Sequence, residues 1–181
     1  ARDLGKRLVP ASDGADMCIS SWCKLDPRTV PIAAKAAANY LNGMLARQDA
    51  QKNGCDMAVM LDTQGFIAEG ATESIFLVKG GRIMTPSLGT VLHSITRDSV
   101  ITLARGLDIP VVESRLTPDL LETADEIFFT CTPMKVLPVK TCEKRPLAPV
   151  PGPVTRQLMD VMAEVTTGRH RRSASWLFPV S

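Results

Sequence analysis

Two adjacent glycines, Gly80 and Gly81, separate two short apolar runs in the middle of this 181-residue chain. The first run extends from Ile75 to Lys79 and the second from Arg82 to Thr85. A two-glycine turn tolerates the positive φ angles that a tight hairpin requires, so the segments predict a pair of antiparallel strands. The hairpin commits this part of the chain to a sheet.

Strands and helices of mixed order are predicted around this hairpin. Strand-like patterns come first, and helix and strand then alternate, which favours a sheet-rich mixed α/β (α+β) domain over a regular doubly wound one. The predicted strands are residues 17–22, 57–62, 111–114, 125–130 and 136–139, with another beginning at Phe66. The predicted helices are residues 32–53, 95–107 and 154–166, with a short one that opens at residues 117–119.

Composition and charge narrow the class of protein. With 45% hydrophobic and 22% charged residues, the chain falls in the ordinary globular range, and a net charge of +2 does not indicate nucleic-acid binding. Five cysteines without a C-x-x-C pair and only two histidines argue against disulfides and a metal site. No apolar stretch is long enough to span a membrane, so we expect a cytoplasmic protein. A nucleic-acid role for the basic run 169–172 is the weakest alternative.

Lys35 is the first candidate for chemistry, because it is the only charged residue between Ile32 and Ala38. On a small, apolar helix start its amine would be partly desolvated, and a neutral amine can form a Schiff base. The alternative is a lysine that extends from the helix to water. Tyr40 lies about 140° round a regular helix from Lys35, so both can contact one ligand only if Lys35 sits at or just before the first turn.

A carboxylate and two threonines are further candidates. Glu69 ends an apolar strand, where its charge would be costly unless it met a cation or a hydrogen-bond donor. Thr96 lies where a polar segment opens a helix, and free N–H groups there favour a phosphate. Thr132, followed by Pro133, resembles another helix start. Taken in isolation, both threonines are better explained as ordinary helix caps.

Together these segments resemble the large C-terminal domain of the fold type IV pyridoxal-phosphate enzymes. That class includes branched-chain aminotransferases, D-amino acid aminotransferases and aminodeoxychorismate lyases, and the similarity runs from Ile19 to Met162. The motifs that carry it, in the family's order and spacing, are Pro31–Lys35 with Asn39-Tyr40, Gly65–Gly70 leading to Ile75-Phe76, Ile95–Arg97, Ala124–Phe128 leading to Thr132 and Pro138-Val139, and Gly152–Thr155. The resemblance implies a D-amino acid aminotransferase-like fold, a sheet-rich pseudo-barrel with flanking helices.

The resemblance also implies a cofactor, pyridoxal 5'-phosphate, and a role for each candidate. Lys35 would hold the cofactor as a Schiff base and move the proton between the substrate Cα and the cofactor C4′. Glu69 would pair with the pyridinium nitrogen, which keeps the ring an electron sink. Tyr40 would bond the phenolic oxygen, and Leu92 would pack on the ring face. The implied phosphate contacts are the backbone N–H groups of Ile95 and Thr96, the Thr96 hydroxyl, and Thr132.

Within the class, the segments around Lys35 and from Glu69 to Phe76 are most similar to branched-chain aminotransferases. The implied reaction exchanges an amino group between a branched-chain-like amino acid and a 2-oxo acid, in a homodimer. Two segments depart from that family: Thr72-Glu73-Ser74 replaces the usual Gly-x-Asn, and Cys131-Thr132-Pro133 replaces the usual Gly-Thr-Ala. Proline has no N–H, so the second departure removes a backbone donor for the substrate carboxylate.

The domain organisation follows from the same resemblance. We expect residues 1–168 to form the cofactor-binding large domain and residues 169–181 a basic C-terminal tail. The family's smaller N-terminal domain is expected to be absent from this chain. Two alternatives to an aminotransferase stay open: a lyase of the aminodeoxychorismate type, which uses the same lysine for elimination, and a truncated, catalytically inactive domain kept for oligomerisation or regulation.

Overall fold

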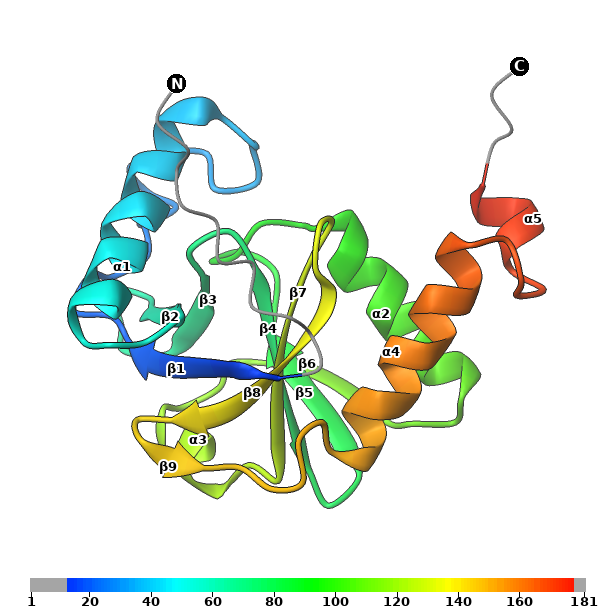
Figure 1. Cartoon of the computed structure of the whole chain (residues 1–181). Coiled ribbons are helices and arrows are strands. Elements are labelled where there is room, and N and C mark those ends of the chain that lie inside the picture. Colours follow the sequence, from blue (N-terminus) through cyan, green and yellow to red (C-terminus); the bar gives the residue numbers. More distant parts are fainter. Residues whose placement is uncertain (1–12, 178–181) are drawn as a thin grey trace, which may run out of the picture.

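The computed structural model describes residues 13–177 and arranges them as one curled sheet with helices outside it (Figure 1). The strands are β1 (Ala15–Ile19), β2 (Met57–Leu61), β3 (Ile67–Gly70), β4 (Ser74–Lys79), β5 (Arg82–Pro86), β6 (Val111–Ser114), β7 (Glu126–Cys131), β8 (Lys135–Cys142) and β9 (Arg145–Pro146). The helices are the short 3₁₀ helix η1 (Ala37–Asn39), α1 (Tyr40–Lys52), α2 (Ile95–Gly106), α3 (Asp119–Thr123), α4 (Pro153–Thr166) and α5 (Ser173–Trp176). The predicted mixed α/β class with flanking helices is confirmed.

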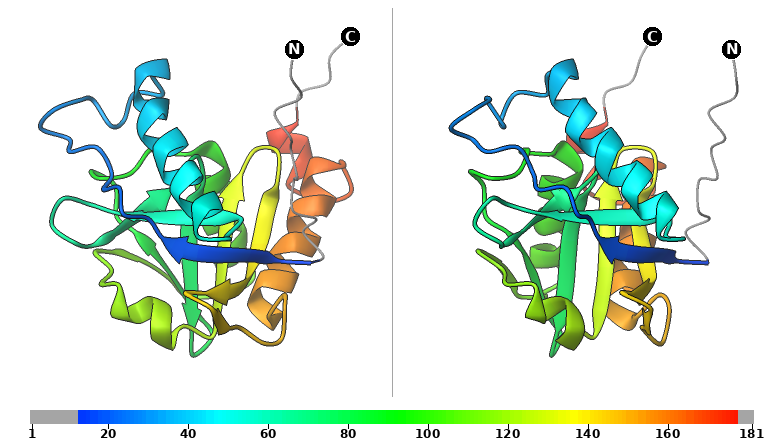
Figure 2. Two further views of the ribbon diagram at one scale, coloured as in Figure 1. Left: turned by 60° about the vertical axis from the view of Figure 1, so that its left-hand side comes forward. Right: turned by 90° about the vertical axis from the view of Figure 1, so that its left-hand side faces the viewer.

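Strand β8 joins the two halves of the sheet. The strand order is β3-β2-β1-β8-β7-β4-β5-β6, with β9 paired to β8 at the side. Near its start β8 is antiparallel to β7, where Lys135 faces Cys131, and further along it is parallel to β1, where Val139 faces Ala15. Because one strand serves both halves, the sheet bends round on itself (Figure 2).

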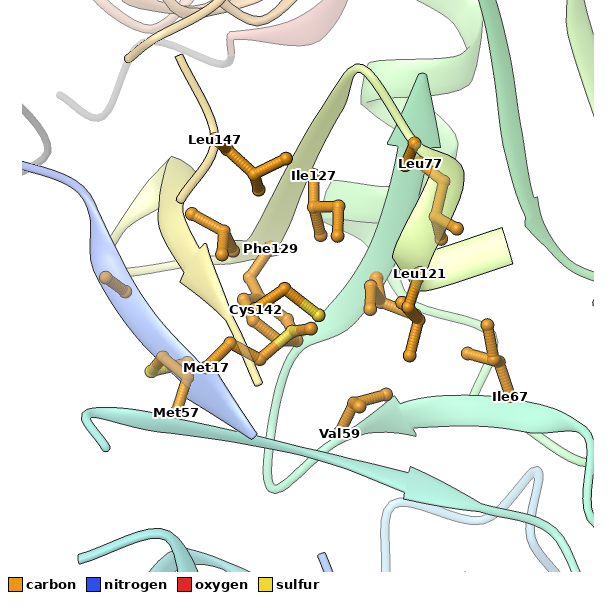
Figure 3. Close-up of a cluster of buried hydrophobic side chains, with 14 of the residues drawn as sticks. Met17, Met57, Val59, Ile67, Leu77, Leu121, Ile127, Phe129, Cys142 and Leu147 are labelled. Carbon is orange, nitrogen blue, oxygen red and sulfur yellow. The ribbon is translucent and has the colours of Figure 1, made fainter. Parts of the chain in front are cut away.

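The main core fills the inside of this bend. Met17 and Met57 enter it from one half of the sheet, and Ile127 and Phe129 enter it from the other (Figure 3). All four are buried. This contact between the two halves closes the sheet into the pseudo-barrel expected from the sequence.

A second core lies on the outer face of β4 and β7, under helices α2 and α4. Successive residues of β4 serve the two cores in turn: Ile75 belongs to the inner core, and Phe76 belongs to the outer one. Phe76 stacks on Phe128 of β7 with ring centroids 5.0 Å apart. Buried strands of this kind are apolar on both faces, which explains their nearly continuous apolar sequence.

Helix α1 covers the remaining face, over β1 and β2 (Figure 1). Its contact residues are the small Ala46 and Ala50, which pack against Ala58 and Met60. Short side chains bring the helix close to the strands, and this closeness fixes where its N-terminal end lies.

The hairpin predicted from the paired glycines is confirmed. Gly80 and Gly81 connect β4 to β5 with φ angles of 57° and 73°, the left-handed values that a two-residue turn requires.

Two local predictions are wrong. The helix predicted over residues 32–53 begins only at η1, because Ala36 is extended (φ −80°, ψ 139°). The amide of Asn39 instead donates to the carbonyls of Pro31 (3.4 Å) and Ala34 (3.3 Å), which holds residues 31–36 as a loop. The helix start predicted at Thr132 is the turn between β7 and β8, because those antiparallel strands pair directly across it.

The C-terminal part of the described chain packs on the outer core. Ser173 in α5 is buried, and Trp176 contacts the outer core beside α4. The predicted boundary at residue 168 stays a prediction. Among residues 13–177, no helix is long and apolar enough to cross a bilayer. Nor does any group of three or more His, Cys, Asp or Glu side chains in this range form a possible metal site.

Candidate functional site

A cavity of about 240 Å³ lies where the ends of several elements meet. Its walls come from the loop before α1, the end of β3, the turn into β4, the segment before α2 and the turn after β7. Six of the seven residues proposed from the sequence line this cavity: Lys35, Tyr40, Glu69, Leu92, Ile95 and Thr132. A larger cavity of about 310 Å³ is lined by none of them.

Lys35 lies in the loop that precedes η1 and is exposed. The desolvation predicted for its amine is therefore not present, because residues 32–36 do not form a helix packed against the core. The loop position does meet the geometric condition for sharing a ligand with Tyr40. Since Lys35 precedes the first turn of helix, both side chains line the same cavity.

Tyr40 is positioned by the close approach of α1 to the turn between β3 and β4. A Cβ atom on Gly43 would lie 2.1 Å from the carbonyl oxygen of Ala71, so only glycine allows this contact. The contact sets the first turn of α1, with Tyr40 at its start, beside the residues that follow Glu69.

Glu69 is a buried carboxylate that meets both a cation and a donor. Its Oε1 atom lies 2.6 Å from Nζ of Lys24, and its Oε2 atom accepts the backbone N–H of Leu92 at 3.2 Å. Burial raises the pKa of Glu69, and Lys24 opposes that shift. The sequence predicted that this charge needed a partner, and the structure identifies the partner as Lys24.

A second buried carboxylate, Glu73, lies in the same wall. It accepts hydrogen bonds from the Thr72 N–H (2.8 Å) and hydroxyl (2.6 Å), and Arg47 on α1 donates to it at 3.1 Å. Burial raises the pKa of Cys131, a cavity residue that is electrostatically coupled to both Glu73 and Arg47. The cavity wall thus has two buried carboxylates, Glu69 and Glu73, beside a thiol.

The N-terminus of α2 forms a positive part of the site. The Ser94 hydroxyl caps the helix by accepting the N–H of Arg97, whereas the N–H groups of Ile95 and Thr96 donate to no residue within 13–177. Free N–H groups and the helix dipole favour a bound anion here. Ile95 is 86% exposed and lines the cavity. Thr96 follows it in the first turn but is not part of the cavity wall.

Sequence reasoning missed Lys24 and Arg47. Lys24 follows a predicted strand in an irregular segment, and Arg47 sits on an exposed part of a helix, so neither shows a local pattern. Their roles depend on contacts with Glu69 and Glu73, which are far away in sequence. The only available signal was the cost of burying Glu69 without a cation.

Comparisons with known proteins converge on one family. A family model described as amino-transferase class IV matches residues 6–142. A probable branched-chain-amino-acid aminotransferase of Aquifex aeolicus is 37% identical over 177 residues, which cover 96% of this chain and 57% of that protein. The branched-chain-amino-acid aminotransferase of Salmonella typhimurium is 37% identical over 170 residues, covering 93% and 55%. The chain therefore spans a little over half the length of these curated relatives.

Solved structures agree. The branched-chain aminotransferase of Thermoproteus uzoniensis with norvaline is 35% identical, with a TM-score of 0.89, over 93% of this chain and 56% of that one. The branched-chain amino acid aminotransferase of Thermobaculum terrenum in its PLP form (holo form) is 39% identical, with a TM-score of 0.86, over 93% and 56%. The branched-chain amino acid aminotransferase of Escherichia coli also matches, with a TM-score of 0.89 at 36% identity, over 92% and 56%.

Proposed function

The chain belongs to the class IV aminotransferases, and from that premise we propose that it is the cofactor-binding part of a pyridoxal-phosphate-dependent aminotransferase. Its substrates would be a branched-chain-like amino acid and a 2-oxo acid. One observation carries the proposal: an amine, a buried carboxylate and a free helix N-terminus, from Lys35, Glu69 and α2, line one cavity. These groups match the aldehyde, ring nitrogen and phosphate of pyridoxal 5'-phosphate.

The cofactor, when bound, supplies an electron sink that makes the substrate Cα proton acidic. Residues of this chain would bind and orient the cofactor and move the proton. The Lys35 amine would hold the cofactor at its aldehyde carbon and, once a substrate amine has displaced it, would carry the proton between the substrate Cα and the cofactor C4′. Glu69 would hold the ring nitrogen, Tyr40 would bond the phenolic oxygen, and Leu92 would pack on the ring face. The phosphate contacts in this proposal are the N–H groups of Ile95 and Thr96, the Thr96 hydroxyl, and Thr132.

Transamination is favoured over the lyase reaction because the curated relatives are aminotransferases. The substrate side of the cavity is less typical of that family: Cys131 lines it where Gly is usual, and Pro133, which has no N–H, follows Thr132 where Ala is usual. We therefore propose that this chain recognises the substrate carboxylate through fewer backbone donors than its relatives.

A homodimer in the cytoplasm completes the proposal. Exposed apolar side chains next to the cavity and on the outer face of α1 support an assembly that covers them: Ile95 is 86% exposed, Leu41 62% and Met44 60%. Light scattering on the purified protein tests the dimer, and a monomer at micromolar concentration would contradict it. Cell fractionation tests the compartment.

Trapping of the cofactor tests the central claim. The protein is incubated with pyridoxal phosphate, reduced with borohydride and mapped by mass spectrometry. We expect a visible absorption band before reduction and a covalent adduct on Lys35, both lost in Lys35→Ala. Lys52→Ala, which removes an exposed lysine at the end of α1, is the matched control and keeps both. No band in the wild type, or a band that survives Lys35→Ala, would overturn the proposal and leave an inactive domain.

Assays of the reaction separate the two catalytic alternatives. Transfer of the amino group of leucine to 2-oxoglutarate identifies an aminotransferase. Release of pyruvate from aminodeoxychorismate without amino transfer identifies a lyase.

A further inference from the structure

Lys24 is a second amine in the wall of the proposed cofactor site, and it is almost entirely withdrawn from solvent. Its side chain is 10% exposed, and that of its partner Glu69 is 9% exposed. The two atoms that pair, Nζ of Lys24 and Oε1 of Glu69, are 2.6 Å apart. A buried ion pair of this kind is costly to assemble and requires a fixed geometry.

The backbone around Lys24 is fixed on both sides. The N–H of Lys24 donates to the carbonyl of Leu61 at 2.7 Å, at the end of β2. The side chain of Asn42 on α1 spans the residues that flank Lys24. Its amide donates to the Cys23 carbonyl at 2.9 Å, and its carbonyl accepts the Leu25 N–H at 3.3 Å. The lysine is therefore held against Glu69 by the fold and not by its own side chain alone.

Burial and three neighbouring groups determine the charge of Glu69. Burial and the like charge of Glu73 raise its pKa, whereas Lys24 and the Leu92 N–H lower it. Burial is the largest of these effects and Lys24 the largest opposing one. Arg47 already engages Glu73 at 3.1 Å and does not replace Lys24. Removing Lys24 would leave a buried carboxyl beside another carboxylate, a setting that favours the protonated form.

We propose that Lys24 is a positioning residue for the cofactor: it keeps Glu69 anionic and occupies Oε1, so that Oε2 faces the ring nitrogen as an acceptor. The part of this inference that concerns the cofactor rests on the proposed function. The part that concerns the charge of Glu69 does not. A carboxylate oxygen has two lone pairs, and Oε2 accepts only the Leu92 N–H among residues 13–177. Because Nζ of Lys24 is engaged by Glu69 at 2.6 Å, the covalent bond to the cofactor would form at Lys35 although both amines line the cavity.

Infrared titration of the cofactor-free protein tests the electrostatic part directly. The C=O stretch of a protonated carboxyl group is separate from the carboxylate bands, and Glu69→Gln identifies which signal belongs to Glu69. We expect Lys24→Met to raise the titration midpoint of Glu69 by at least about one unit, whereas Lys24→Arg leaves it close to the wild-type value. The control is Lys140→Met, which breaks a half-buried pair with Asp16 (3.2 Å) outside the cavity and should not change the midpoint. An unchanged midpoint in Lys24→Met would overturn the proposal.

A double variant keeps the test decisive if Lys24→Met does not fold. When Glu69 is replaced by glutamine, Lys24 has no anion to hold, so Lys24→Met should no longer lower the urea midpoint in that background. Recovery of folding in the double variant supports the proposal. Equal loss of stability in both backgrounds, or failure of the double variant to fold, shows a role in packing and contradicts it.

The effect of Lys24 on cofactor binding is tested by comparing two ligands. Pyridoxal phosphate is compared with its analogue in which the ring nitrogen is replaced by CH, and affinity is measured by fluorescence. The wild type and Lys24→Arg should prefer pyridoxal phosphate by at least about tenfold, the equivalent of one pKa unit, and Lys24→Met should bind both equally. A preference that survives in Lys24→Met overturns this part. If no variant binds either ligand, the proposed function fails, while the Glu69 titration still reports on Lys24.

Discussion

Glu126 links the start of helix α4 to strand β7. It is buried at the start of β7, and its carboxylate accepts the N–H groups of Val154 (3.0 Å) and Thr155 (2.7 Å) at the first turn of α4. Gly152 makes the approach possible, because a Cβ atom there would lie 2.2 Å from the Glu126 carboxyl carbon. A negative charge against free N–H groups at a helix N-terminus is favourable, and here it joins a helix to the sheet.

We therefore expect Glu126→Gln to lower the free energy of unfolding by about 1.5–3 kcal/mol, the range for hydrogen bonds to charged groups. Urea denaturation followed by circular dichroism measures it. Glu122→Gln, which changes an exposed carboxylate on α3, is the control and should change the stability little. Equal effects of the two substitutions would show that the cap contributes nothing.

At the scale of elements, the β4–β5 hairpin depends on the left-handed backbone of its glycines. Gly81 has a φ angle of 73°, and nothing lies within 4 Å of the place that a Cβ atom would take, so a substitution there meets backbone strain alone. Gly81→Val should lower the free energy of unfolding by about 1–2 kcal/mol, and Gly81→Asn by less, because asparagine enters this region more readily. Thermal or urea denaturation of the pair measures the difference. Equal losses would contradict the strain argument.

The link between β1 and α1 carries a pH dependence. One carboxylate oxygen of Asp49 on α1 accepts the Ser21 N–H at 2.7 Å and the hydroxyls of Ser21 (3.0 Å) and Ser20 (3.1 Å). These bonds, the Ser21 N–H first, hold the pKa of Asp49 below its usual value. A carboxyl with a lowered pKa in the folded state stabilises the protein above its ordinary pKa and loses that contribution as the pH falls through the folded value.

Asp49→Asn should therefore destabilise the protein at neutral pH and have a smaller effect in acid. Urea midpoints between pH 7 and pH 3 measure the trend, with Asp160→Asn on the exposed side of α4 as the control. A loss of stability in Asp49→Asn that does not depend on pH would contradict the assignment.

Elements with local signals were the ones that sequence could predict. The Gly80-Gly81 turn and the start of α2 at Ile95 are each signalled by adjacent residues, and both were predicted correctly. The alanine-rich segment before Tyr40 has high helix propensity, yet it forms a loop because the Asn39 amide satisfies its carbonyls instead. Lys24 could not be predicted, since its partner Glu69 reaches it only through the pairing of distant strands.

For the molecule as a whole, the inner and outer cores share strands β4 and β7. Phe128 belongs to the outer core and its neighbour Phe129 to the inner one. Because the same strands contribute to both cores, we expect a substitution in either core to lower the stability of the whole protein. Phe128→Leu and Phe129→Leu should each cost about 1–2 kcal/mol, less than the 3–5 kcal/mol typical of truncation to alanine.

Both variants should still unfold in a single transition, because neither core can persist without the shared strands. Tryptophan fluorescence and circular dichroism, followed in the same urea titration, check this. Transitions that separate in one variant only would show that its core is an independent unit.

The pairing of β1 with β8 has a consequence for how the protein is made. The hydroxyl of Thr141 on β8 donates to Asp16 on β1 at 2.6 Å, and these residues are 125 positions apart in the chain. During synthesis β1 leaves the ribosome long before β8 exists, so the edge of β1 that pairs with β8 must stay unpaired while the intervening residues are translated. Strand closure across so many residues is slow. In the cell, the interval between the emergence of β1 and that of β8 is when this chain has most need of a chaperone.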